Sequence, residues 1–144
     1  MAETDNKKPI IDINEEFKRD IDIIERSGPL KGHNHKHIFL LALALGVENG
    51  RPKPIKKKLS GGFLRREQFS DEEEALIRSI AISHTKGVDI LKKENFTKIY
   101  EIVEEYANAG FPILQSLLSS PGTFEKNLHS RLNKKIRDYK KLIS

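Results

Sequence analysis

The feature that most constrains the fold is an apolar run from Ile38 to Leu45 that contains no polar residue. A helix formed by this run would be apolar on all sides, and such a helix is stable only at the centre of a domain. A buried strand is the alternative for so short a run, but its alternating Ala and Leu, both strong helix formers, favour a helix. Gly46 follows directly and is the expected C-terminal cap. The run therefore predicts a central helix that other elements surround.

The rest of the chain is long enough to form a single domain around this helix. It has 144 residues, of which 37% are hydrophobic and 33% charged, and this length favours a single domain. The absence of cysteine excludes disulfides, thiolate metal sites and a cysteine nucleophile. No apolar run reaches the ~18 residues of a membrane span, and residues 1–9 form a polar tail rather than a secretory signal. We therefore expect a cytoplasmic protein with one folded domain, residues 10–144, and no membrane contact.

Amphipathic patterns predict that this domain is all-α, with five or six helices in a single compact unit. Ser70 is followed three residues later by Glu73, a capping box that opens a helix ending at Gly87. Gly110 is expected to break the next helix, and Pro112 to open a further short one.

The last predicted helix, residues 123–143, has an apolar stripe opposite a basic face. Its apolar residues recur mostly every four positions: Phe124, Leu128, Leu132, Ile136, Tyr139 and Ile143. The basic residues on the other side are Lys126, Lys134, Arg137, Lys140 and Lys141. A helix of this kind binds a polyanion or docks on an acidic partner; an anionic membrane surface fits less well because the helix lacks Trp.

A second basic region lies in an irregular insertion, residues 49–69. Two prolines exclude a helix there, and Ser60-Gly61-Gly62 is a turn signal. Residues 55–59 and 63–69 either pair as a small β-hairpin, at about 55–69, or form an ordered loop. The insertion carries seven cations with no acid between the first and the last: Arg51, Lys53, Lys56, Lys57, Lys58, Arg65 and Arg66.

Both basic regions are candidate nucleic-acid interfaces. Lys and Arg neutralise phosphates and release counterions without needing a sequence motif, and a basic helix face beside a basic loop is the expected footprint. Charge blocks are also typical of plain solvated faces. Phe63 and Phe69, which interleave with the basic loop, either stack on an exposed base or anchor the loop to the core.

A histidine triplet is the only other candidate for chemistry. In an extended segment His33, His35 and His37 would lie on one side, where they could bind zinc or nickel. The alternative is a polar loop leading into a helix, with Asn34 or His35 near its cap. No acidic residue lies between Glu25 and Glu48 to orient the imidazoles. Because no hydrolytic or phosphate-loop motif assembles either, we expect no catalytic residues and no cofactor, and the balance is against an enzyme.

Three strings in the chain resemble a known family: FLLALALGVENGRPKPI from Phe39, EALIRSIAISHT from Glu74 and IYEIVEEYANAGFPILQSLL from Ile99. In this order and spacing, over roughly residues 35–120, they are similar to the dnd system-associated protein 4 family. That family takes its name from loci for DNA phosphorothioation and the associated restriction of foreign DNA. The resemblance implies an accessory role in such a defence system and brings no catalytic residues.

Together, these observations predict a non-enzymatic DNA-binding or DNA-associated accessory protein of a DNA-modification and restriction system. The alternative is an adaptor that docks on an acidic or DNA-handling protein without touching DNA, and a third is a metal-dependent activity at the histidine triplet. The expected partners are DNA or other defence-system proteins, with a homodimer as a further option. The candidate DNA-contacting residues are Arg51, Lys53, Lys56, Lys57, Lys58, Arg65, Arg66, Lys126, Lys134, Arg137, Lys140 and Lys141.

Overall fold

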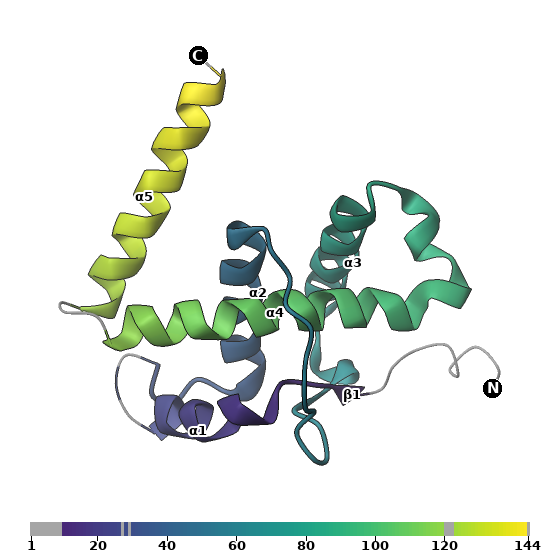
Figure 1. Cartoon of the computed structure of the whole chain (residues 1–144), viewed down its shortest axis with the longest axis horizontal. Helices are drawn as coiled ribbons and strands as arrows, with labels where there is room; N and C mark the ends of the chain where they lie inside the picture. The colour runs from purple at the N-terminus through teal and green to yellow at the C-terminus, as the bar shows by residue number, and fades with distance from the viewer. Residues whose placement is uncertain (1–9, 27, 29, 120–122, 144) are drawn as a thin grey trace.

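Two helices, α2 (His35–Asn49) and α4 (Phe96–Ser119), cross at the centre of the molecule and make its most extensive helix contact (Figure 1). The computed structural model of the chain describes residues 10–26, 28, 30–119 and 123–143. Within them lie five α-helices and one two-stranded antiparallel sheet. The predicted all-α fold is therefore confirmed. The predicted tail, residues 1–9, lies outside the described residues.

The apolar run forms the central part of α2, as predicted. Ile38, Phe39, Ala42 and Leu43 are each at most 1% exposed. The expected cap was wrong: Gly46 lies inside the helix, which ends at Gly50 with a φ of 81°. A left-handed residue at this position is the usual helix terminator, and glycine adopts it without steric cost.

Gly46 has a packing role instead. A Cβ atom at Gly46 would overlap the carbonyl oxygen of Tyr106 in α4, and a Cβ at Gly110 would overlap the carbonyl oxygen of Ala42 in α2. The two glycines therefore allow the backbones of α2 and α4 to touch. This explains a second wrong prediction, because α4 continues through Gly110 and Pro112 rather than breaking there.

The remaining elements pack around the crossing. They include α1 (Lys18–Arg26) and α3 (Asp71–Thr85), and short 3-10 turns occupy Glu15–Phe17, Arg66–Gln68, Val88–Leu91 and Lys93–Asn95. The predicted capping box is present: the Ser70 hydroxyl accepts the Glu73 N–H at 3.2 Å, and the Glu73 carboxylate accepts the Ser70 N–H at 2.8 Å. The second bond, which stabilises the ionised carboxylate, lowers the pKa of Glu73.

The sheet joins the start of the chain to the insertion. β1 (Ile10–Ile11) pairs with β2 (Leu64–Arg65), and the pairing continues irregularly to the hydrogen bond from Glu15 N–H to the Lys57 carbonyl, at 2.8 Å. The two halves of residues 55–69 thus pair with residues 10–15 and not with each other, so the hairpin alternative was wrong. The physical reason is burial, since Ile11 and Ile13 are 0% and 1% exposed and hold this segment against the core.

The last helix, α5 (Phe124–Ile143), leaves the end of α4 and projects away from the body (Figure 1). Phe124 is buried, Leu128 is half-buried, and Leu132 and Ile136 are 49% and 51% exposed. The side chains of Tyr139 and Ile143, which would extend the stripe, lie outside the described side chains. None of the described helices is both long and apolar enough to cross a bilayer.

Candidate nucleic-acid interface

The first basic region is a loop, residues 51–58, whose backbone is fixed by α4. The Lys53 N–H donates to the carbonyl oxygen of Glu105 at 3.0 Å. The amide of Asn108 donates to the carbonyl oxygens of Lys53 and Pro54, at 2.9 and 3.1 Å. Asn108 is 1% exposed, so the donor side of its two hydrogen bonds is buried in the body. We call residues 51–58 the basic loop below.

A buried carboxylate on α4 holds the strand that runs alongside this loop. Glu104 is 3% exposed and accepts the N–H of Asp12 at 2.5 Å. Asp12 in turn lies 3.5 Å from the ammonium of Lys58. A buried charge is tolerated only where polar partners compensate its lost hydration. Glu104 and Asn108 were not predicted as site residues, although both lie in the string at Ile99–Leu118 used for the resemblance.

The cations of the basic loop point to solvent. Arg51, Lys53, Lys56, Lys57 and Lys58 are all exposed. Two of them have acidic neighbours: Lys57 lies 3.2 Å from Glu15, and Lys58 pairs with Asp12.

Arg51, Lys53 and Lys56 differ from those two. No carboxylate among the described residues lies within 4.0 Å of any of the three. They are therefore the cations of the loop whose charge the described part of the molecule leaves uncompensated.

The two arginines that follow the loop lie in different surroundings. Arg65 is exposed, 3.9 Å from Glu67. Arg66 lies 3.6 Å from Glu74, with its guanidinium carbon 5.7 Å from the ring centroid of Tyr100. The Tyr100 hydroxyl donates to Glu74 at 2.7 Å, and burial together with this acidic neighbour raises the pKa of Tyr100. The side chain of Arg66 is thus engaged with α3 and α4.

The two aromatic residues of the insertion serve as anchors. Phe69 is 7% exposed and lies 6.1 Å from the ring of Phe39. Phe63 is half-buried and stacks on His35, with ring centroids 4.5 Å apart. Phe69 is thus an anchor in the core, and His35 covers one face of the Phe63 ring.

The second basic region lies on α5, away from the loop. Figure 1 shows the loop passing over the middle of α4, whereas α5 leaves from its end. Arg131 ties α5 to the end of α2 by two hydrogen bonds to one Glu48 oxygen, at 2.5 and 3.1 Å. The predicted cations of this helix are exposed: Lys126, Lys134, Arg137, Lys140 and Lys141. The structure therefore presents two separate basic surfaces rather than one.

The histidines do not gather at one point. Asn34 caps α2 by accepting the His37 N–H at 3.1 Å, so His35 and His37 belong to a helix. The three imidazoles therefore do not lie on one side of an extended segment. His33 and His37 lie edge to face, 6.0 Å apart, and line an apolar cavity of about 330 Å³. The ring of His35 turns instead to Glu25 of α1 and to Phe63. The cap alternative is therefore the one observed.

Comparison with known protein families gives a match over nearly the whole chain. A family model described as DNA sulphur modification system-associated protein 4 matches residues 5–141 of the chain. No curated protein and no solved structure matches the chain.

Proposed function

Because the chain belongs to the DNA sulphur modification system-associated protein 4 family, we propose that it is a non-enzymatic DNA-binding accessory protein of such a system. Its contact with DNA is made by the basic loop, through phosphates rather than bases. The family name supports only the association with the system. The proposal of direct DNA contact rests on the three uncompensated cations of the loop, Arg51, Lys53 and Lys56.

The fixed backbone of the loop favours this use. Asn108 and Glu105 hold Lys53 and Pro54, and prolines at 52 and 54 restrict the chain on either side of Lys53. A loop ordered before binding loses little conformational entropy when a ligand arrives. The guanidinium of Arg51 can form two parallel bonds to one phosphate, while lysines act as point charges.

The test is fluorescence anisotropy of a labelled duplex titrated with the protein at 50 and 200 mM salt. Each neutralised phosphate contributes about −0.9 to the slope of log K against log salt. Three contacts therefore predict about 40-fold weaker binding at the higher salt. Changing Arg51, Lys53 and Lys56 to Gln should remove most of this salt dependence.

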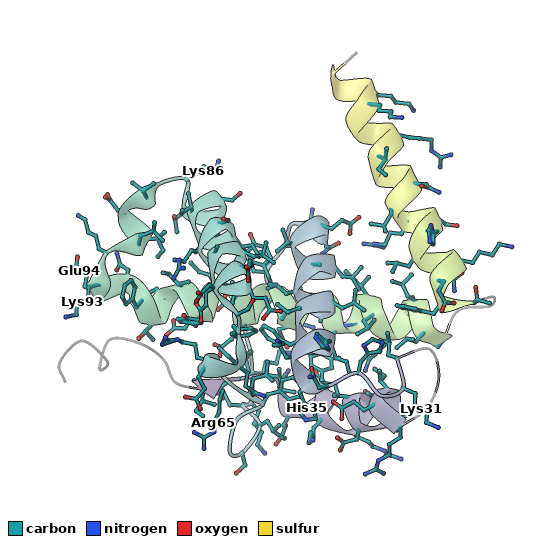
Figure 2. All side chains as sticks on the ribbon, turned by 180° about the vertical axis from the view of Figure 1, so that it is seen from behind. Lys31, His35, Arg65, Lys86, Lys93 and Glu94 are labelled. Carbon is teal, nitrogen blue, oxygen red and sulfur yellow. The ribbon has the colours of Figure 1, made fainter. Side chains whose placement is uncertain are left out.

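The matched control removes the same charge elsewhere. Lys86, Lys93 and Lys98 are exposed, and Figure 2 shows Lys86 and Lys93 well away from Arg65. Their change to Gln should leave the slope unaltered. Equal losses in both triple variants, or no binding at the lower salt, would refute DNA contact by the loop.

A second function, a protein adaptor, is favoured by α5. Leu132 and Ile136 are half-exposed on a projecting helix whose other side is basic. An acidic partner with an apolar groove would cover both features. Co-elution with the purified proteins of the same modification system tests this. Leu132→Gln with Ile136→Gln should abolish a complex, whereas Val88→Gln, at a 67% exposed site, should not. Complex formation that survives the double change would exclude α5 as the docking surface.

A further inference from the structure

The corner between α1 and α2 brings three metal-ligating side chains together. Asp22 and Glu25 lie one turn apart on α1, and His35 is the first residue of α2. One ligand atom from each lies within 4.8 Å of the other two, and all three residues are half-buried. Figure 2 shows His35 where the start of α2 meets α1. The sequence did not reveal this grouping because nine residues lie between Glu25 and His35.

Glu25 directs a buried oxygen at His35. Its Oε1 atom contacts Nδ1 of His35 as an ion pair. A buried carboxylate oxygen needs a proton donor or a cation to offset its lost hydration. That partner is either a proton on the imidazole or a metal ion bound between the two atoms.

The ring of His35 is held in place from its other side. It stacks on Phe63 with an interplanar angle of 16°. This contact fixes the plane of the imidazole while Nδ1 faces α1. Metal sites need such support, because a ligand held in its binding orientation loses less entropy on coordination.

We propose that Asp22, Glu25 and His35 form a binding site for a divalent transition-metal ion, Zn²⁺ or Mn²⁺. One imidazole nitrogen with two carboxylate oxygens is a donor set that suits the borderline ion Zn²⁺, and the two carboxylates also suit the harder Mn²⁺. With bonds of about 2.0–2.2 Å, two ligands of one tetrahedral ion lie about 3.3 Å apart. Small side-chain rotations would achieve this spacing.

The site would have an open position. Three protein ligands leave at least one coordination position of a four-coordinate ion for water. The ion would tie α1 to the start of α2 and, through the stacked ring, to Phe63 beside the sheet. This is an assignment separate from the histidine triplet, because His33 and His37 face the apolar cavity instead.

A lysine competes with the metal. Lys18 lies 2.8 Å from Oδ1 of Asp22. Its hydrogen bond lowers the pKa of Asp22. The ammonium also repels a divalent cation. Removal of the lysine charge should therefore strengthen metal binding.

The alternative is a metal-free ion pair between protonated His35 and the two carboxylates. The charged groups facing His35 in that case are Asp22, Glu25 and, through Asp22, Lys18 and Arg26. A titration with metal distinguishes the two cases, because a metal-free ion pair takes up no added ion at this corner.

The experiment is calorimetric titration of the chelator-treated full-length chain with ZnCl₂, and separately with MnCl₂. We expect one ion per chain, at least about tenfold weaker binding for His35→Asn and for Asp22→Ala, and a few-fold tighter binding for Lys18→Gln. Thermal unfolding should shift upward with metal only in chains that keep the site.

The chain offers matched controls two residues on either side of His35. His33→Asn and His37→Asn remove an imidazole of the same chemistry and should leave the affinity unchanged. Asp22 is a half-buried residue on α1 outside the core, so Asp22→Ala keeps the test decisive if His35→Asn fails to fold. The proposal is overturned if no saturable binding occurs, if binding survives the loss of His35 and Asp22, or if it depends on His33 or His37.

Discussion

The basic loop and α5 carry similar charge but are attached to the body in opposite ways. The loop is irregular in outline, yet the buried side chain of Asn108 and the backbone carbonyl of Glu105, both on α4, hold its backbone at Lys53 and Pro54. α5 is regular, and its described side chains meet the body near its first turns: Phe124 is buried, Leu128 is half-buried, Asn127 donates to the carbonyl oxygen of Leu117 at 3.2 Å, and Arg131 pairs with Glu48.

The difference follows from where each backbone finds its hydrogen bonds. A helix satisfies nearly all its own N–H and C=O groups, so α5 can project from the body. A loop with two prolines cannot do so, and its polar groups must be satisfied by other parts of the chain. Regular secondary structure is therefore no guide to how firmly a basic surface is held. Four changes test this comparison.

The largest effect should come from Gly110→Ala. This change disturbs the packing of α4, the helix that holds the loop, without altering a residue of the loop itself. The added Cβ would overlap the backbone of α2 at Ala42. We expect a loss of about 3 kcal/mol in the free energy of unfolding, measured in urea. Gly87→Ala is the control, since no atom lies within 4 Å of a Cβ there. Similar values for both variants would contradict the close crossing of α2 and α4.

Asn108→Ala should loosen the loop selectively. It removes the hydrogen bonds to the carbonyls of Lys53 and Pro54, at a cost of about 1–3 kcal/mol. Amide exchange of Lys53 should accelerate before that of α5. Asn133→Ala, at an exposed position on α5, serves as the control. If exchange in the loop stays unchanged, Asn108 does not anchor it.

Arg131→Met should loosen α5 and leave the loop unchanged. Its side chain and that of Glu48 are 32% and 22% exposed, so solvent screens the pair and the loss should be about 1 kcal/mol or less. Amide exchange in α5 should rise while the loop is unaffected, and high salt should reduce the difference from the wild-type chain. Faster amide exchange in the loop as well would show that the two regions are coupled.

Leu132→Gln with Ile136→Gln should have the smallest effect. Both side chains are about half-exposed, so the free energy of unfolding should change by no more than about 0.5 kcal/mol. Leu114→Gln, at a fully buried position, should unfold the chain in the same assay. A large loss from the exposed pair would instead mean that a second copy covers the stripe in solution, which sedimentation would reveal.

Local chemistry made some elements predictable. Ser70 and Glu73 lie three residues apart, so their capping box depends on no distant contact. The apolar run of α2 had to be central because it has no polar face. The uncertain parts of the candidate sites were those whose partners lie far away in the chain. Examples are Asn108 below the loop and Glu25 beside His35.

The sequence by itself determined the central helix, the basic character of the loop and of α5, and the family. Each depends on residue type or on spacing within a few positions. Only the tertiary structure decided that Gly46 and Gly110 are contacts rather than helix ends, because a glycine's local preference is outweighed when two backbones touch. It also decided that the insertion pairs with residues 10–15, since burial of Ile11 and Ile13 brings that segment alongside it.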